Sequence, residues 1–323
     1  MGAAFASLAI PAFAEDIDLA ELGVPEIGTE IVLAPGAAAG DEIGQHRFVV
    51  RFEPANNSTA GLIRDKFMRE GIFAEVLDEL SEQIALPADF PIIFGHCSEV
   101  NAYYAPSERA VHMCYELIEM YNTSYEGLTG DSKQVLGWAD QSSVLTGTTL
   151  FILLHEIGHA MTDIFDLPIT GREEDAVDQF ATTILIEADE EVDAFEERPS
   201  RLALLGAQFF LALSSAPNEI TRNVFANEHA LGQQRFFDVM CLVYGADPET
   251  YGPILTPAMV MVEEAYEKAP ETFDQEKYMS WLSRTDELNV LPWQRAIRCP
   301  NEYARYSASW DYLVDTFLVP QGD

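Results

Sequence analysis

Two histidines and a glutamate lie within five consecutive residues of this chain, in the run His155-Glu156-Ile157-Gly158-His159. Residues four apart lie on one face of an α-helix, so His155 and His159 can both reach a single tetrahedral metal ion. Glu156 then lies beside the position of a metal-bound water, where it can accept a proton. The spacing therefore predicts a zinc site, with Zn²⁺ as the cofactor and Glu156 as a catalytic residue. The alternative is a helix whose histidines only pack or bind a stray ion.

The motif supplies two of the three protein ligands that a catalytic zinc ion usually has, with water in the fourth position. Asp163 follows His155 by eight residues on the same predicted helix, which is about 12 Å along the axis at 1.5 Å per residue. That distance is too long for the two side chains to share one metal ion. The third ligand is therefore expected from an element that folds back onto the motif.

Acidic residues after the predicted turn at 167–171 are the expected source of that ligand. Thr170 and Glu173 have the S/T-x-x-E spacing of a capping box, which gives Glu173 a structural role at a helix start. Glu174 is then the expected metal ligand, and Asp178, one turn later, is placed to fix the tautomer of a ligating imidazole. Glu173 is the alternative ligand, and a further alternative is that both acids only complement a helix N-terminus.

Hydrolysis at such a site also needs a donor for the oxyanion that forms on the substrate. His229, the one histidine downstream of the motif, and Tyr104, on a predicted edge strand, are the two candidates, although His229 can also be a surface or core residue. The strand near Asn101 to Tyr104 is predicted to bind an extended peptide by strand addition, unless Tyr103 and Tyr104 pack in the core. Three further histidines have no companions at ligand spacing and are interpreted as structural: His46, His96 and His112.

The composition predicts a globular protein with an acidic surface. The 323 residues are 48% hydrophobic and 22% charged, and 54 acidic against 18 basic side chains give a formal net charge of −36. Such a surface repels phosphate backbones and anionic lipids, so we expect neither a nucleic-acid partner nor polybasic membrane binding. We also expect no stable membrane span, because the apolar stretch 202–213 is short and is interrupted by Gln208.

The N-terminal region differs from the rest of the chain. Residues 1–14 are signal-like, since nearly all are small or apolar and Ala12-Phe13-Ala14 has the pattern of a cleavage site. The usual basic residues are missing, so a flexible tail is the alternative. Residues 15–45 predict a flexible acidic linker rich in Ala, Gly and Pro, and residues 46–323 predict one folded domain.

Four cysteines fit an exported protein with two disulfides, and we expect a periplasmic or secreted location. Cys97 and Cys114 flank one short strand-rich segment, so we expect them to pair locally. That leaves Cys241 to pair with Cys299. The alternative is four free, buried thiols.

The order of the predicted elements places a small sheet first and helices afterwards, which indicates an α+β fold. Strands are predicted over 47–53, 91–95, 102–105 and 109–114, and helices over 59–84 and 115–121. The motif falls on a helix over 146–165 that is apolar on nearly every side in its first half and so runs through the core. A second helix over 172–187 carries the acids, and further helices are predicted over 200–215, 230–245, 256–267, 273–283 and 301–317.

On these residues the chain resembles the gluzincin branch of the HExxH metallopeptidases, in which a Glu ligand is followed four residues later by an Asp. It is similar, more closely, to a bacterial metallopeptidase family catalogued as a domain of unknown function. The matching stretches are HEIGHAMTDIFDLPITGREEDAVDQFA (155–181), NAYYAP (101–106), EHALGQQRF (228–236), CLVYGADP (241–248) and RCPNEY (298–303). The resemblance implies a zincin-like metallopeptidase domain over 46–323 and hydrolysis of a peptide or protein substrate.

Two other functions remain open at this point. One is a zinc-binding protein without catalysis, in which a fourth protein ligand would close the metal site. The other is a metal-dependent amide hydrolase that acts on cell-wall material. The predicted residues for the catalytic reading are His155, His159 and Glu174 as ligands, with Glu156 and His229 as catalytic groups.

Overall fold

The computed structural model describes residue 40 and residues 42–125, 137, 139–192, 194–214, 229–272 and 274–320. The predicted signal-like segment, residues 1–14, and most of the predicted linker lie outside the described residues. The described part of the chain is mostly helical with one small mixed sheet, as the order of the predicted elements indicated.

The sheet has four strands in the order β1-β2-β4-β3: β1 (Phe48–Phe52), β2 (Phe90–Gly95), β4 (Ala110–Cys114) and β3 (Ala102–Ala105). Strands β1, β2 and β4 are parallel, whereas β3 pairs antiparallel with β4. The turn between β3 and β4 includes Arg109, which has a left-handed φ of 48°. Because β3 comes last in the strand order, it is an edge strand, with one side of its backbone outside the sheet.

The single helix expected over 59–84 is two helices, α1 (Ser58–Glu70) and α2 (Ile72–Ser81). Gly71 separates them with a φ of 69°, a left-handed conformation that favours glycine and ends a helix. The amphipathic pattern alone did not reveal this break, because both helices present apolar residues to the same core.

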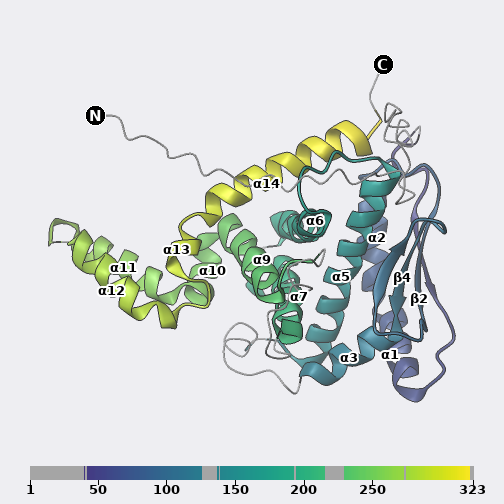
Figure 1. Ribbon diagram of the computed structural model, residues 1–323, viewed down its shortest axis with the longest axis horizontal. Helices are drawn as coiled ribbons and strands as arrows, with labels where there is room; N and C mark the ends of the chain where they lie inside the picture. The colour runs from purple at the N-terminus through teal and green to yellow at the C-terminus, as the bar shows by residue number, and fades with distance from the viewer. Residues whose placement is uncertain are drawn as a thin grey trace, which may run out of the picture. The chain divides into compact units, whose positions relative to one another are not determined.

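The motif lies on the central helix α5 (Gln141–Ile164), which contacts β3 and β4 on one side and α6 (Glu173–Glu187) and α7 (Ser200–Ser214) on the other (Figure 1). The helix begins five residues before the predicted Thr146, because the side chain of Asp140 accepts a hydrogen bond from Ser143 N and caps it. Within the described part of the chain, α5 is the one helix long and apolar enough to cross a membrane. Its apolar window is 94% buried inside the protein, which identifies it as a core helix.

The other helices complete the domain, and α7 contacts both α5 and α9 (Figure 1). They are α3 (Tyr115–Ser124), α9 (Gly232–Ala246), α10 (Pro248–Leu255), α11 (Pro257–Lys268), α12 (Gln275–Thr285), α13 (Trp293–Ala296) and α14 (Cys299–Leu313). Short 3₁₀ segments lie at η2 (Ala188–Glu191), η3 (Phe195–Glu197), η4 (Pro270–Thr272) and η5 (Asp286–Leu288), and a π segment, η6 (Val314–Leu318), extends α14. Helices α10 and α13 were not expected from the sequence. Proline in the first turn helps to start α10, because its fixed φ suits that position.

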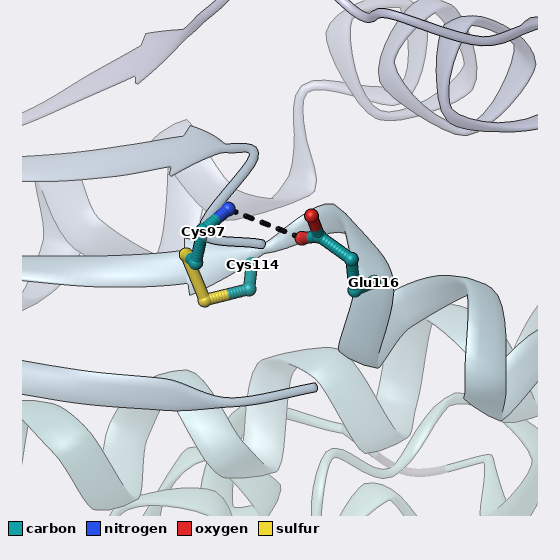
Figure 2. Close-up of side chains that lie close together, drawn as sticks. All are labelled: Cys97, Cys114 and Glu116. Atoms are coloured by element: carbon teal, nitrogen blue, oxygen red, sulfur yellow. Dashed lines mark hydrogen bonds between the residues drawn. A yellow bond between two sulfur atoms is a disulfide. The ribbon is translucent and has the colours of Figure 1, made fainter. Parts of the chain in front are cut away.

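Both expected disulfides are present. Cys97 bonds to Cys114 at the end of β4, with a Cα–Cα distance of 5.4 Å, and Cys241 on α9 bonds to Cys299 at the start of α14, at 5.0 Å. Figure 2 shows that the Glu116 carboxylate lies beside the first bridge and accepts a hydrogen bond from the backbone N–H of Cys97 at 3.2 Å. The second bridge links α9 to α14 through two cysteines that are 58 residues apart in sequence.

Candidate metal centre

The site forms where α6 crosses α5, and Gly158 inside the motif permits that crossing. A Cβ atom at this position would lie 2.8 Å from Val177 Cβ and 3.2 Å from a ring carbon of Phe180, both on α6. These distances are shorter than ordinary van der Waals contacts, so a larger residue would push the helices apart. The glycine between the two motif histidines therefore allows α6 to bring its first turn onto α5.

Three predicted ligands come together at this crossing: His155, His159 and Glu174. Glu174 Oε2 lies 3.3 Å from His155 Nε2, and Glu174 Oε1 lies 3.4 Å from His159 Nε2. One ligand atom from each of the three residues falls within 4.8 Å of the other two. Of the two acids considered for the third ligand, it is Glu174 that faces both imidazoles through its two oxygens.

Electrostatics agree with a cationic occupant at this point. Burial raises the pKa of the Glu174 carboxyl, but its interactions with His155, His159 and His229 outweigh burial and hold that pKa far below its usual range. Glu174 Oε2 is buried, and the imidazole nitrogens His155 Nε2 and His229 Nε2 lie 3.3 and 3.0 Å from it. A metal ion at this point would offset the cost of burying the ionised carboxylate.

The expected capping box does not form, so the prediction for Glu173 is wrong. The helix α6 begins at Glu173 itself, with Arg172 as an extended N-cap residue that makes no side-chain cap bond. Thr170 therefore precedes the N-cap and is not in position to cap. Glu173 Oε1 instead lies 2.6 Å from His159 Nδ1, because an imidazole beside the first turn is a stronger partner for the carboxylate than a backbone N–H.

Asp178 lies behind His155, where the sequence placed it. Its Oδ1 atom is 2.8 Å from His155 Nδ1, which leaves His155 Nε2 facing Glu174. Burial lowers the pKa of His155, whereas hydrogen bonds to Asp178 and Glu174 raise it, and the net result is a pKa of about 9.

Arg235 on α9 completes this side of the site, and no sequence argument singled it out. It donates from Nε to Asp178 Oδ2 and from Nη2 to Asp178 Oδ1, both at 2.7 Å. Its only sequence signal was an arginine within the mostly apolar stretch 235–243 of a chain poor in basic residues. That signal did not identify a partner, because the two residues are 57 positions apart.

Glu156 points from α5 towards the edge strand. Its Oε2 atom accepts a hydrogen bond from the backbone N–H of Tyr104 at 3.1 Å, and the residue is 8% exposed. Burial raises the pKa of the Glu156 carboxyl, which increases its affinity for a proton near neutral pH.

The two candidate oxyanion donors lie in different places. His229 Nε2 is 3.0 Å from Glu174 Oε2, and its side chain is 43% exposed, so it borders the site and solvent. The Tyr104 hydroxyl instead donates to Asp163 Oδ2 at 2.7 Å, and burial together with Asp163 raises the pKa of that hydroxyl. Tyr103 stacks on His112 with ring centroids 5.0 Å apart. Of the two candidates, His229 is the one that borders the candidate ligands.

The histidines interpreted as structural have partners elsewhere. His46 lies 3.1 Å from Asp89, and His112 lies 3.0 Å from Glu108. His96 Nε2 accepts a hydrogen bond from Asn56 N at 2.9 Å.

A cavity of about 520 Å³ opens beside Glu156, His155 and His229. It lies between α3, α5, α7 and the start of α9, where Arg235 also lines it, and its apolar wall includes Leu117, Met120, Tyr121, Ile152, Phe209 and Phe210. Its position beside the general-base candidate makes it a place for a substrate side chain.

A second group of candidate ligand atoms, among the residues that the structure describes, is Cys97, Cys114 and Glu116. Both sulfurs are joined in a disulfide, as Figure 2 shows, and metal ligation by cysteine needs the thiolate. This group is therefore not a metal site in the oxidised protein.

Comparison with known proteins agrees with the chemistry of the His155 site. The chain belongs to the protein family described as "Putative metallopeptidase", whose sequence profile matches residues 52–283. The matched region contains the motif, Glu174, Asp178, His229 and Arg235. No curated protein and no solved structure matches the chain significantly. The family implies a metal ion and a peptide or protein substrate, and the two imidazoles and buried carboxylate fit such an ion.

Proposed function

We propose that this protein is a zinc-dependent, zincin-like endo- or exopeptidase that uses a metal-activated water. The observation that supports this most directly is the convergence of His155 Nε2 and His159 Nε2 on the Glu174 carboxylate, whose oxygens lie 3.3 and 3.4 Å from them. Two imidazoles and one carboxylate are a donor set of catalytic zinc sites, in which the fourth position stays open. His155, His159 and Glu174 would hold the ion.

A zinc ion bound there supplies a water whose pKa is brought towards 7 and polarises the substrate carbonyl. Glu156 accepts a proton from the attacking water and later passes it to the leaving amine. The Tyr104 backbone N–H orients the Glu156 carboxylate for this task. His229 donates to the oxyanion of the tetrahedral intermediate from the open side of the site.

The substrate peptide lies along the outer edge of β3, where backbone groups can extend the sheet by strand addition. One of its side chains enters the apolar cavity beside Glu156, so substrates with a bulky apolar residue next to the cleaved bond are favoured. A periplasmic or secreted location is supported by the two disulfides, which form in oxidising compartments.

The test is metal analysis of the purified protein combined with cleavage of a broad peptide library by wild type, Glu156→Gln and a control, Glu108→Gln. Glu108 undergoes the same chemical change, but it pairs with His112 on the β3–β4 hairpin. We expect one zinc ion per chain, a loss of about 10²- to 10⁴-fold in turnover for Glu156→Gln, and wild-type activity for the control. Full activity of Glu156→Gln would contradict the mechanism.

A second candidate function is zinc binding without catalysis, and the position of His229 is the observation that favours it. Its Nε2 atom is 3.0 Å from Glu174 Oε2, which is close enough for a shift to make it a fourth ligand. A zinc-loaded wild type that cleaves no peptide, together with zinc loss in His229→Asn, would support this function. Cleavage of cell-wall fragments instead of peptides in an extended library would support an amide hydrolase.

A further inference from the structure

Arg235 makes a two-point contact with a carboxylate that touches a metal-ligand candidate. Its Nε and Nη2 atoms each lie 2.7 Å from a different oxygen of Asp178. Its guanidinium group also lies 3.6 Å from the centroid of the Phe210 ring, over the ring face. Arg235 and Asp178 are both buried, with side-chain exposures of 10% and 9%.

This contact limits how Asp178 can turn. A carboxylate held by one hydrogen bond can rotate about its terminal torsion, which is broad and soft. Two parallel hydrogen bonds from a planar guanidinium fix both oxygens at once. Asp178 Oδ1 is then held where it meets His155 Nδ1 at 2.8 Å, and the imidazole presents Nε2 to the metal site.

The Arg235 guanidinium also compensates the charge of the Asp178 carboxylate, and both groups are buried. Removal of the guanidinium would leave a buried carboxylate with the imidazole as its main partner. The anion would then be free to seek water or another donor and to carry His155 with it.

The helix α9, which carries Arg235, is held against α14 by two further links. Cys241, later on α9, is bonded to Cys299 at the start of α14. Arg295 adds a second link, since it contacts Asp238 on α9 at 3.1 Å and Glu302 on α14 at 2.6 Å. The disulfide and the Arg295 ion pairs therefore restrain the helix from which the Arg235 guanidinium reaches Asp178.

We infer that Arg235 is a positioning residue that sets the orientation of His155 through Asp178 and thereby the affinity of the site for its metal. The inference rests on the proposed function, because it requires that His155 is a metal ligand. It goes further in naming a residue on a third helix on which the metal affinity depends. The simpler view is that Arg235 only packs α9 against α6 and contributes to stability alone.

Arg201 offers a matched control for this distinction. It is also a buried arginine on a core helix, 5% exposed, and its guanidinium lies 4.6 Å from the Phe195 ring centroid. It donates to the Phe195 carbonyl oxygen at 3.1 Å, whereas the Asp178 oxygens are bound by His155 and Arg235. Substitution of either arginine by methionine removes a buried charge and a ring contact, but only one of the two touches the metal-site network.

The experiment measures the zinc dissociation constant by competition with a chromophoric chelator, together with thermal unfolding of the zinc-free protein. The full-length variants are Arg235→Met, Arg235→Lys, Arg201→Met, Asp178→Asn and the double variant Arg235→Met/Asp178→Asn. We expect Arg235→Met to weaken zinc binding by about 10- to 100-fold. Arg201→Met keeps the wild-type zinc affinity, whatever its unfolding temperature.

Two further results are expected if Arg235 acts through Asp178. Arg235→Lys loses less affinity than Arg235→Met, because it keeps the charge but not the fork geometry. The double variant binds zinc no more weakly than Asp178→Asn alone, since the arginine has nothing left to position. The double variant and the lysine variant also keep the test decisive if Arg235→Met does not fold.

Several outcomes overturn the inference. Wild-type zinc affinity in Arg235→Met does so, as does a loss in Arg235→Lys as large as in Arg235→Met. An equal loss in Arg201→Met also overturns it, because that loss would reflect packing in general. An additive loss in the double variant shows that Arg235 does not act through Asp178. A wild type that binds no zinc overturns the proposed function and this inference with it, which distinguishes the two failures.

Discussion

The two sides of the candidate metal site are built differently. The inner half, which is His155, Asp178 and Arg235, has side-chain exposures of 5%, 9% and 10%. The outer half, which is His159, Glu173 and His229, has side-chain exposures of 17%, 49% and 43%. Each half orients one ligand imidazole through a carboxylate on Nδ1, at 2.8 Å for His155 and 2.6 Å for His159.

The difference in exposure means that the two carboxylate–imidazole contacts contribute different amounts of free energy. The inner carboxylate is held by a buried guanidinium, so its removal leaves an uncompensated charge in a region of low dielectric. The outer carboxylate is half exposed, so water and salt replace much of what it contributes. We therefore expect the inner half to set metal affinity, and the outer half to meet the substrate.

The largest effect on turnover in this comparison is expected at the outer half, in His229→Asn. Loss of an oxyanion donor costs about 10²- to 10³-fold in kcat. Zinc affinity, measured by chelator competition, is expected to stay at the wild-type value, because His229 is not among the three ligand candidates that lie within 4.8 Å of one another. Loss of zinc in this variant would instead make His229 a ligand.

A direct comparison of the halves comes from Asp178→Asn and Glu173→Gln, which make the same chemical change behind the two ligand imidazoles. We expect zinc affinity to fall by about 10- to 100-fold in Asp178→Asn. In Glu173→Gln the loss is expected below about fivefold, as for an exposed pair worth up to about 1 kcal/mol. Zinc affinity is measured for both variants at low and at high salt. If the two variants lose the same zinc affinity under both conditions, exposure of the carboxylate does not decide the difference.

Gly158→Ala is expected to disturb both halves together. The added methyl group meets Val177 and Phe180 at distances that force α5 and α6 apart, at a cost of about 1–3 kcal/mol in the free energy of unfolding. Chemical denaturation of the zinc-free protein measures this cost. The variant Gly171→Ala is the control, because a Cβ there has no neighbour within 4 Å. A Gly158→Ala protein as stable as Gly171→Ala would show that the helices can repack.

The smallest effect is expected outside both halves, in Asp247→Asn. Asp247 caps α10 by accepting a hydrogen bond from Thr250 N at 3.0 Å and pairs with Arg198 at 2.6 Å. Burial raises the pKa of Asp247, but these hydrogen bonds outweigh it and lower that pKa below 3.8. Asparagine can still cap the helix, so we expect a stability loss of up to about 1 kcal/mol from the neutralised pair with Arg198, with zinc affinity unchanged.

The pH dependence of this loss has a definite sign. Because the folded pKa of Asp247 lies below the unfolded value, the carboxylate stabilises the fold above about pH 4. This contribution disappears as the pH falls through the folded pKa. Denaturation curves of wild type and Asp247→Asn are therefore expected to differ at pH 6 and to converge towards pH 3. A constant difference down to pH 3 would contradict the assigned role.

Most elements of the fold could be predicted from periodicity and turn residues, including the four strands, the motif helix and both disulfide pairs. The errors have local physical causes. One predicted helix divides at Gly71, because glycine adopts a left-handed conformation there. The capping box at Thr170 and Glu173 is absent, because α6 starts later and Glu173 faces an imidazole. The spacing of residues along the chain reveals neither the left-handed conformation of Gly71 nor the imidazole that faces Glu173.

The sequence by itself predicted the chemistry proposed for this protein, because two histidines four residues apart on one helix must share a face whatever surrounds them. It also limited the third ligand to a short acidic run. Only the tertiary structure decided that Glu174 rather than Glu173 faces both imidazoles, that Gly158 permits the helix crossing, and that Arg235 holds Asp178. These facts depend on how distant helices pack, and packing is set by the whole core rather than by residues close in the chain.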